Sequence, residues 1–401
     1  MECVDVPTRR GLWVSGPARV VVERGSLLGT GFVLDAGAEI LVRGGRGSSL
    51  YALEDSRICL GLGAGGSYRL VGKGFELVEE WRRVLEELRS KGSRRVVVVG
   101  GVESGKSTLS AWAYNVLGLC VIESDVGQNE LGTPAMVSFA EPGAGQVISL
   151  QDLVPSGGFF VGHVSAEKVI DLVIAASLRA ARRCNTYVMD TDGFVESRGA
   201  IYKRALVEAL EPDAVVVLGH KRLSEELRGL GVDVIPAPRV PEELARLRSR
   251  GDRRAYRQRL YASLFTGSKP VVLRGVSIEH LCPYTIGENQ VIYTCGRRAF
   301  IESRHRAPPP AQWLRPGWAK GLLAGLRTSG GDVLAVVEDI DLAREKIVVR
   351  PARQAGNALG GVDSVILGWI RLREDLSEEH YQPSWYPEAL VQRRLGRSVS
   401  R

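Results

Sequence analysis

The middle of the chain alternates short, wholly apolar runs with longer segments in which apolar residues recur every three or four positions. The runs predict β-strands, and the longer segments predict helices. Strands that are apolar throughout are buried on both faces, so this region predicts a parallel sheet covered by helices on both sides. The expected strands are Val96–Val99, Cys120–Glu123, Thr186–Asp190, Ala214–Leu218 and Val232–Ile235, and the expected helices are Thr108–Leu117, Ala166–Arg183, Ala200–Leu210 and Ser224–Leu230.

The two ends of the chain show a different pattern of short Val- and Leu-rich runs separated by glycine or proline. Such runs predict β-rich domains, the first of them antiparallel. Between the first domain and the middle, Phe75–Leu88 has helical spacing. With 401 residues, more than one hydrophobic core is expected. We predict an N-terminal β-domain at 1–75, an α/β domain at 76–267 and a C-terminal β-rich domain at 268–401, whose polar tail from about 375 is expected to be partly disordered.

The most informative motif begins where the first strand of the middle region ends. Residues 100–108 read GGVESGKST, which fits the phosphate-binding pattern GxxxxGK[ST] between a strand and a helix. Glycine lets the backbone curl so that its N–H groups face phosphate oxygens, and the helix N-terminus favours the same anion. We therefore predict a nucleotide-binding P-loop, with Lys106 on the β- and γ-phosphates and Ser107 on Mg²⁺. The predicted nucleotide-binding residues are Gly100, Gly101, Val102, Glu103, Ser104, Gly105, Lys106, Ser107 and Thr108.

Carboxylates follow the next two strands of the middle region. Asp125 and Gln128 come after Cys120–Glu123, and Asp190 ends Thr186–Asp190. Ligands of open α/β sheets bind at the carboxyl ends of the strands. Asp125 and Asp190 are therefore candidates for holding Mg²⁺ or its water, and Asp125 is also a candidate base for an attacking hydroxyl. Aspartate and glycine are also common in turns without any function. The functional prediction therefore rests on the position of these residues beside the expected P-loop.

The spacing Asp190…Gly193 also fits the DxxG switch of GTPases. A GTPase would need an NKxD-like sequence, which reads guanine, after the next strand. The residues there are Leu218-Gly219-His220-Lys221-Arg222, with no carboxylate. The sequence therefore disfavours a GTPase.

An arginine-rich segment, Pro241–Tyr261, follows the last expected strand of the middle region. Arg253 and Arg257 are four residues apart and would share one face of a helix. A solvated basic helix is the usual outcome of such a run. The alternative is a lid whose guanidinium groups stabilise a phosphoryl group during transfer. The arginines are Arg246, Arg248, Arg250, Arg253, Arg254, Arg257 and Arg259.

Composition narrows the class of protein. The chain is 44% apolar and 25% charged, which favours a folded protein. Nine of its 53 basic residues are lysines, so 44 are arginines, and the net charge is +7. The arginine excess is compatible with a polyanionic partner, but genome composition or heat adaptation would produce it too.

The spacing of the cysteines and the lack of long apolar stretches indicate the kind of compartment that suits the protein. The cysteines at 3, 59, 120, 184, 282 and 295 form no CxxC pair, so neither a zinc site nor a disulfide framework is expected, and a reducing cytoplasm suits them. We also expect no signal peptide and no membrane span.

Taken together, these motifs resemble the polynucleotide 5′-hydroxyl-kinase family, the archaeal RNA/DNA kinases related to eukaryotic pre-mRNA cleavage-factor and pre-rRNA-processing kinases. The resemblance covers about 95–267. Glu123 and Phe194 differ from the Asp and Trp that many relatives have. The motifs that carry the resemblance are Gly100–Thr108, Asp125–Gln128, Thr191–Phe194, the arginines around Arg253 and Arg257, and Leu264–Gly267.

The resemblance implies an α/β fold with a central P-loop NTPase domain flanked by β-rich domains. It implies transfer of the γ-phosphate of ATP to the 5′-OH of RNA or DNA. We expect a single-stranded end to fit best, because a duplex end would crowd a site that encloses a terminal hydroxyl. Lys106, Asp125, Arg253 and Arg257 would be catalytic, and Ser107, Asp125 and Asp190 would hold Mg²⁺. The N-terminal domain would help hold adenine. Candidate acceptor contacts are Gln128, Thr133, Pro134, Thr191 and Phe194.

Two alternatives stay open. One is an ATP-bound scaffold in an RNA-processing complex with little catalysis. The other is a generic P-loop ATPase or GTPase whose hydrolysis does not depend on an oligonucleotide. Asp125 together with the arginine pair disfavours the scaffold, because a protein that only binds ATP needs no acceptor-side base.

Overall fold

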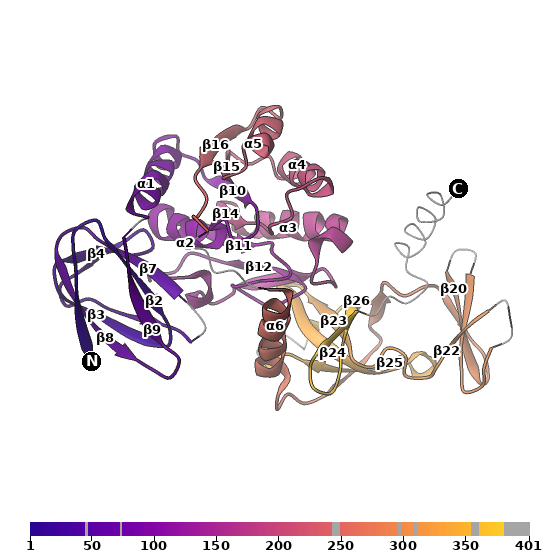
Figure 1. Cartoon of the computed structure of the whole chain (residues 1–401). Coiled ribbons are helices and arrows are strands. Elements are labelled where there is room, and N and C mark those ends of the chain that lie inside the picture. Colours follow the sequence, from indigo (N-terminus) through magenta and orange to yellow (C-terminus); the bar gives the residue numbers. More distant parts are fainter. Residues whose placement is uncertain are drawn as a thin grey trace, which may run out of the picture.

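The computed structural model describes residues 1–44, 47–72, 74–242, 249–295, 298–307, 309, 311–353 and 361–380. These residues form three lobes (Figure 1). A β-rich N-terminal lobe and a β-rich C-terminal lobe flank a central α/β lobe, which confirms the predicted fold class. No helix among the described residues is long and apolar enough to cross a membrane. The domain limits at 75/76 and 267/268 stay predictions.

The central lobe is built on a seven-stranded sheet in the order β13-β12-β11-β14-β10-β15-β16. Its five parallel strands match the predicted ones to within two residues at either end. They are β10 (Arg95–Gly100), β11 (Cys120–Glu123), β14 (Tyr187–Asp190), β15 (Ala214–Leu218) and β16 (Asp233–Ala237).

One edge of this sheet differs from the prediction. Strands β12 (Met136–Ala140) and β13 (Gly157–Phe160) were not among the predicted strands, and they extend the parallel sheet with antiparallel pairing. β13 contains two glycines and only two apolar side chains, so its sequence alone carries little strand signal. Hydrogen bonding to β12 therefore stabilises β13 as a strand, although its own sequence has a low strand propensity.

Helices cover both faces of the central sheet because successive side chains of a strand point to opposite faces. Val96 and Val98 of β10 pack with α1 (Phe75–Ser90) and α2 (Lys106–Leu117). Val97 and Val99 pack on the other face. The helices there are α3 (Ile170–Cys184), α4 (Arg198–Leu210) and α5 (Lys221–Arg228).

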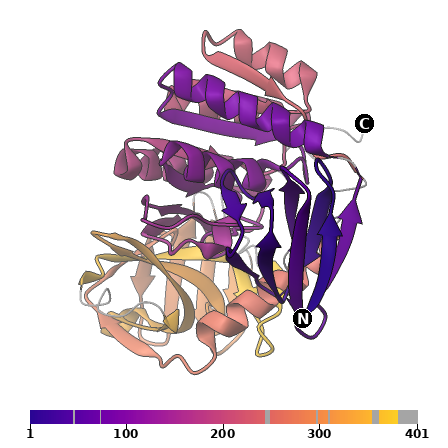
Figure 2. The ribbon, with the colours of Figure 1, turned by 90° about the vertical axis from the view of Figure 1, so that its left-hand side faces the viewer.

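The N-terminal lobe consists of two sheets with antiparallel pairing, as predicted (Figure 2). The four-stranded sheet has the order β1-β8-β3-β6, and the five-stranded sheet has the order β5-β4-β7-β2-β9. The strands are β1 (Glu2–Val6), β2 (Gly11–Ser15), β3 (Ala18–Arg24), β4 (Ser26–Leu28), β5 (Val33–Asp35), β6 (Glu39–Val42), β7 (Gly47–Ala52), β8 (Ser56–Leu62) and β9 (Ser67–Val71).

The cysteine prediction was wrong. Cys3 and Cys59 form a disulfide between directly opposite positions of β1 and β8, and Cys120 bonds to Cys184. Cys282 is also disulfide-bonded. The first two pairs are separated by 56 and 64 residues, so only the tertiary fold brings the sulfurs together. The cysteine pattern therefore no longer argues for a reducing compartment.

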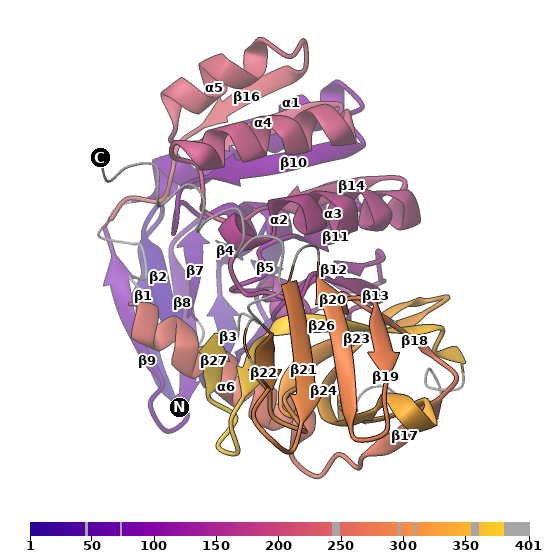
Figure 3. The same ribbon diagram turned by 90° about the vertical axis from the view of Figure 1, so that its right-hand side faces the viewer.

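The C-terminal lobe contains a larger sheet in the order β17-β25-β24-β23-β26-β18, with β27 paired to β26, and a small sheet in the order β19-β20-β21-β22 (Figure 3). β27 lies in the tail expected to be partly disordered, so that tail is ordered through His380, and 381–401 fall outside the described residues. The strands are β17 (Val271–Arg274), β18 (Ser277–Glu279), β19 (Tyr284–Ile286), β20 (Gln290–Cys295), β21 (Arg298–Ser303), β22 (Gln312–Leu314), β23 (Leu322–Thr328), β24 (Gly331–Asp341), β25 (Lys346–Pro351), β26 (Ser364–Leu372) and β27 (Glu378–His380).

One helix joins the central and C-terminal lobes. α6 (Arg250–Phe265) lies beside the C-terminal sheet (Figures 1 and 3). Its buried residues Tyr261, Leu264 and Phe265 share a hydrophobic cluster with Val164 of the central lobe and Ile370 of β26. Each buried aromatic or leucine side chain stabilises such a cluster by about 1.5–3 kcal/mol relative to exposure. The arginine-rich helix is therefore anchored to the C-terminal lobe.

Candidate active site

A cavity of about 660 Å³ lies at the carboxyl ends of β10, β11 and β14. Its walls come from the N-terminal lobe, α1, the P-loop, the loops after β11 and β14, and α6. The predicted site residues that line it are Val102, Glu103, Ser104, Gly105, Lys106, Ser107, Thr108, Asp125, Gln128, Thr191, Phe194, Arg253 and Arg257.

Other predicted residues lie away from the cavity wall. Asp190 is buried beneath it, at 1% exposure. Pro134 is buried, and the hydroxyl of Thr133 donates to the sulfur of Met136 at 2.9 Å. The structure therefore does not bring Thr133 and Pro134 to the cavity with the other candidates. Gly100 and Gly101 lie at the start of the P-loop, outside the lining.

The P-loop is shaped by its glycines. Gly105 precedes α2 with φ of 100°, a left-handed conformation that favours glycine. A Cβ at this position would lie 2.6 Å from Val240 Cγ2 and 2.7 Å from the Trp81 ring, so a larger residue does not fit. Lys106 is 7% exposed, and its ammonium donates to the carbonyl of Gly101 at 2.6 Å. The lysine is therefore held over the loop at the helix N-terminus, where anions bind.

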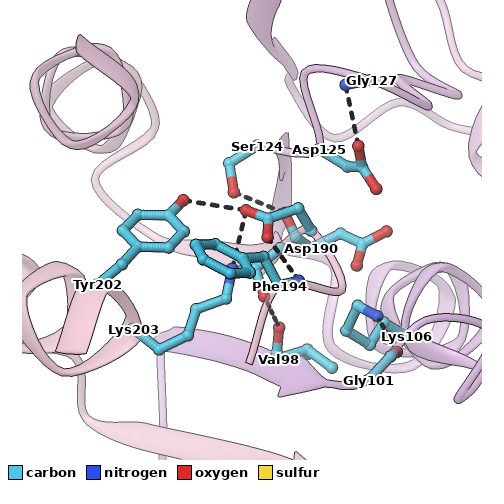
Figure 4. Close-up of polar contacts among 12 residues, drawn as sticks. Val98, Gly101, Lys106, Ser124, Asp125, Gly127, Asp190, Phe194, Tyr202 and Lys203 are labelled. Atoms are coloured by element: carbon cyan, nitrogen blue, oxygen red, sulfur yellow. Dashed lines mark hydrogen bonds and ion pairs between the residues drawn. The ribbon is translucent and has the colours of Figure 1, made fainter. Parts of the chain in front are cut away.

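Asp125 lies across the cavity from this loop. Its Oδ1 accepts hydrogen bonds from the main-chain N–H groups of Gly127 at 3.0 Å and Gln128 at 2.9 Å. Burial and the nearby carboxylate of Asp192 raise the pKa of Asp125. In Figure 4 the carboxylates of Asp125 and Asp190 point to the side on which Lys106 lies. The turn thus holds Asp125 towards the phosphate end of the cavity.

Beneath Asp125, two buried carboxylates face each other across β11 and β14. Glu123 and Asp190 are paired in register, and each is 1% exposed. Both oxygens of Glu123 and Oδ1 of Asp190 lack a hydrogen-bond partner of good geometry among the described residues. The main-chain N–H of Glu130 interacts with Glu123 only weakly, so it opposes but does not prevent the rise in the pKa of Glu123. Burial raises the pKa of Asp190 to about 7, and burial together with Asp190 raises the pKa of Glu123.

These orphaned oxygens fit a divalent cation. The Ser107 hydroxyl hydrogen-bonds to Asp190, so a serine and a carboxylate converge at the end of the P-loop. Mg²⁺ prefers oxygen ligands and keeps several waters, which could bridge to buried carboxylates such as Glu123. The donor set therefore suits Mg²⁺.

Sequence reasoning missed a buried charged network in the loop after β14. Asp192 Oδ2 accepts from Lys203 Nζ at 2.9 Å and from the Tyr202 hydroxyl at 3.1 Å, and its Oδ1 accepts from the Phe194 N–H at 2.8 Å. Lys203 is fully buried. The sequence does carry one indication of this network, which is a lysine on the apolar face of a predicted helix. A buried charge is rare unless it is paired, so such a lysine predicts a buried carboxylate partner. The network holds the loop that carries Phe194. In Figure 4 the side chains of Tyr202 and Lys203 lie to the left of the picture, away from Lys106.

The same loop is fixed to the central sheet and the P-loop. The Thr191 hydroxyl donates to the carbonyl of Val98 at 2.8 Å. A Cβ on Gly193 would lie 2.6 Å from Val102 Cγ2, so glycine lets the two loops touch. Phe194 lines the cavity and also packs on the core.

The arginines of α6 form the remaining wall. Arg250, Arg253 and Arg257 line the cavity, so Arg253 and Arg257 share a face as their spacing predicts. Arg257 is paired with Glu378 of β27, which sequence reasoning missed. Arg246 and Arg248 fall outside the described residues.

Several known proteins are similar to this chain in sequence. Residues 100–267 match the family model described as mRNA cleavage and polyadenylation factor CLP1 P-loop. A polyribonucleotide 5′-hydroxyl-kinase of Pyrococcus furiosus is 26% identical over 333 residues, which span 73% of this chain and 91% of that protein. One of Thermococcus kodakarensis is 30% identical over 236 residues, which span 54% and 66%.

Solved structures share the fold. A chain of the wild-type Clp1p–Pcf11p complex superposes with a TM-score of 0.59 at 12% identity, covering 92% of this chain and 97% of that one. At that identity the likeness concerns the fold alone. The family match, the relatives and the assembled P-loop site together establish that this chain belongs to the polynucleotide 5′-hydroxyl-kinase family, with a CLP1-type P-loop domain.

Proposed function

We propose that the protein is an ATP-dependent kinase that transfers the γ-phosphate of ATP to the 5′-OH end of RNA, DNA or both. One observation carries the proposal. A single cavity brings together the P-loop, the Asp125 carboxylate and the arginines of α6, which supply phosphate binding, an acceptor-side base and charge stabilisation. The names of the relatives from Pyrococcus furiosus and Thermococcus kodakarensis support the same activity.

The nucleotide would enter with its phosphates on the P-loop. The main-chain N–H groups of residues 101–107 and the N-terminus of α2 favour the phosphate oxygens, and Lys106 would contact the β- and γ-phosphates. Trp13 and Tyr51 of the N-terminal lobe also line the cavity, which supports a role for the N-terminal lobe in holding adenine.

Mg²⁺ would be held by Ser107, Asp125 and Asp190, directly or through water, with Glu123 behind them. When bound, the ion would neutralise charge on the β- and γ-phosphate oxygens. Asp190 must be ionised to serve as a ligand, and its raised pKa means that a cation would compete with a proton for this pocket.

Phosphoryl transfer would use groups on both sides of the γ-phosphate. As the 5′ oxygen bonds to the γ-phosphorus, the bond to the β–γ bridging oxygen breaks, ADP leaves, and Asp125 accepts the hydroxyl proton. A raised pKa suits a carboxylate to this task at neutral pH. Arg253 and Arg257 would stabilise the charge on the transferring group.

The acceptor end would be held by residues around Asp125. Gln128, Thr191 and Phe194 line this part of the cavity, and Phe194 would stack on a base. Thr133 and Pro134 lie off the cavity wall, so we assign them no direct contact in this proposal. A terminal hydroxyl enclosed by these walls fits a single-stranded end better than a duplex end.

The proposal is tested by incubating the protein with γ-labelled ATP, Mg²⁺ and a 5′-OH oligonucleotide, as single-stranded RNA, single-stranded DNA and blunt duplex. We expect labelled 5′-phosphate on the single strands. Lys106→Ala is the control. Label no higher than in that control would contradict the proposal, and ATP binding without transfer would favour an ATP-bound scaffold instead.

A further inference from the structure

The C-terminal lobe reaches the arginines of the cavity through one buried carboxylate. Glu378 lies on β27, and its side chain is 1% exposed. Its two oxygens accept hydrogen bonds from Nε and Nη2 of Arg257, each at 2.6 Å. This is a bidentate ion pair, in which two N–H groups of the planar guanidinium face the two oxygens of the carboxylate.

Further contacts join the same face of α6 to the segment that carries Glu378, residues 375–378. The Tyr261 hydroxyl donates to Glu378 Oε1 at 3.0 Å, Arg254 donates to the Glu378 carbonyl, and Gln258 donates to the Asp375 carbonyl at 2.9 Å. Residues at positions 254, 257, 258 and 261 share one helix face. The segment from Asp375 to Glu378 therefore fixes the helix at Arg257 and on both sides of it.

The pairing decides which part of the guanidinium faces the cavity. Nε and Nη2 donate to Glu378, whereas Nη1 donates a longer hydrogen bond, of 3.4 Å, to the carbonyl of Gly127 in the turn that holds Asp125. Burial lowers the pKa of Arg257, but the hydrogen bonds that Arg257 donates to Glu378, together with the negative charge of Glu378, raise the pKa above its usual value. Arg257 thus remains a cation whose orientation is set.

We propose that Glu378 is a positioning residue for phosphoryl transfer, holding Arg257 with its Nη1 edge towards the transferring phosphoryl group. The inference rests on the proposed kinase function and gives the C-terminal lobe a part in it. A buried ion pair contributes little net stability, because desolvation of both charges offsets their attraction. A misplacement of about 1 Å at a reacting centre, by contrast, can cost about 100-fold in rate.

The test compares Glu378→Gln in two backgrounds, wild type and Arg257→Ala. In the wild-type background we expect kcat to fall by about 10- to 100-fold with KM for ATP within about twofold. In the Arg257→Ala background the same substitution should change kcat by less than about twofold, because the group that it positions is gone. Glu279→Gln, which breaks the Arg327–Glu279 pair elsewhere in the C-terminal lobe, is the matched control and should keep wild-type kcat.

A binding measurement separates this inference from the proposed function. Affinity for ADP with Mg²⁺ and aluminium fluoride, a mimic of the transferring phosphoryl group, should fall about 10-fold or more in Glu378→Gln, while affinity for ADP alone is unchanged. A wild-type protein without kinase activity would refute the function, and the analogue measurement would still decide the role of Glu378.

Three results would overturn the proposal. They are a Glu378→Gln kcat equal to or above wild type, the same fold-loss in the Arg257→Ala background as in wild type, and equal weakening of ADP and of the analogue. Should Glu378→Gln not fold, Glu378→Asp carries the same test. It keeps the charge but is one methylene shorter, so its kcat should also fall.

Discussion

The P-loop wall and the arginine wall of the cavity are built in different ways. The P-loop is one contiguous stretch, and Lys106 is held by the carbonyl of Gly101, five residues away. The arginine wall needs two segments, because Arg257 is held by Glu378, 121 residues further along the chain. One wall therefore depends on local backbone shape, and the other depends on docking of the C-terminal lobe.

The difference also separates two tasks. A wall made of main-chain N–H groups binds phosphates in every state of the reaction, whereas a guanidinium that faces the transferring group matters most in the transition state. We therefore expect substitutions in the P-loop to weaken nucleotide binding and turnover together. Substitutions in the arginine wall should mainly lower turnover.

The largest effect is expected for Lys106→Ala. The change removes the one P-loop side chain that carries positive charge to the phosphates, so kcat should fall by at least about 10³-fold and ATP binding should weaken. Steady-state kinetics and calorimetry measure the two effects. A loss below about 10-fold in kcat would mean that the P-loop wall is not where the γ-phosphate reacts.

Asp125→Asn comes next. The amide keeps the size of the side chain but cannot accept the hydroxyl proton, so kcat should fall by about 10²–10³-fold. Affinity for ATP, measured in the absence of oligonucleotide, should stay within about threefold. Wild-type turnover in this variant would show that another group is the base.

Arg257→Ala tests the arginine wall directly. Loss of the guanidinium should lower kcat by about 100-fold while affinity for ADP changes by less than about threefold. Arg259→Ala, an exposed position on the same helix, serves as the control and should keep wild-type kcat. Equal losses in kcat and in nucleotide affinity would make Arg257 a binding residue, and the contrast between the two walls would disappear.

The smallest effect concerns stability at low pH near the arginine wall. Burial and the stacked ring of His380 lower the pKa of His163 to about 4, from 6.5. Since the folded protein holds fewer protons than the unfolded chain between these values, its stability should be lost as pH falls from 6.5 towards 4. The free energy of unfolding of wild type should drop by about 2 kcal/mol more than that of His163→Gln between pH 6.5 and 4.5. Parallel curves for the two proteins in chemical denaturation would contradict this.

The P-loop wall could be predicted from sequence because its determinants are local. Lys106 and Ser107 lie in a motif with fixed spacing, and the valines before it identify the strand. The apolar spacing of Phe75–Leu88 likewise indicated α1, whose buried residues include Trp81 beside Gly105. Contiguous patterns of this kind reflect the geometry of a single element, which no distant segment needs to complete.

The arginine wall could be predicted only in part. The spacing of Arg253 and Arg257 placed both on one helix face, but nothing in the sequence near Glu378 marks it as the partner of Arg257. The Cys3–Cys59 disulfide was missed for the same reason, because its sulfurs meet only through the pairing of β1 with β8. Contacts between residues far apart in the chain arise from tertiary packing, and a single sequence carries no direct signal for them.

A crystal structure with ADP, Mg²⁺, aluminium fluoride and a 5′-OH dinucleotide tests the central claim most directly, because it shows both walls around one phosphoryl mimic. The account predicts the 5′ oxygen within hydrogen-bonding distance of the Asp125 carboxylate, with Lys106 and Arg257 both on the fluoride group and Glu378 still paired to Arg257. A 5′ end bound away from Asp125, or an Arg257 guanidinium turned away from the fluoride group, would contradict it.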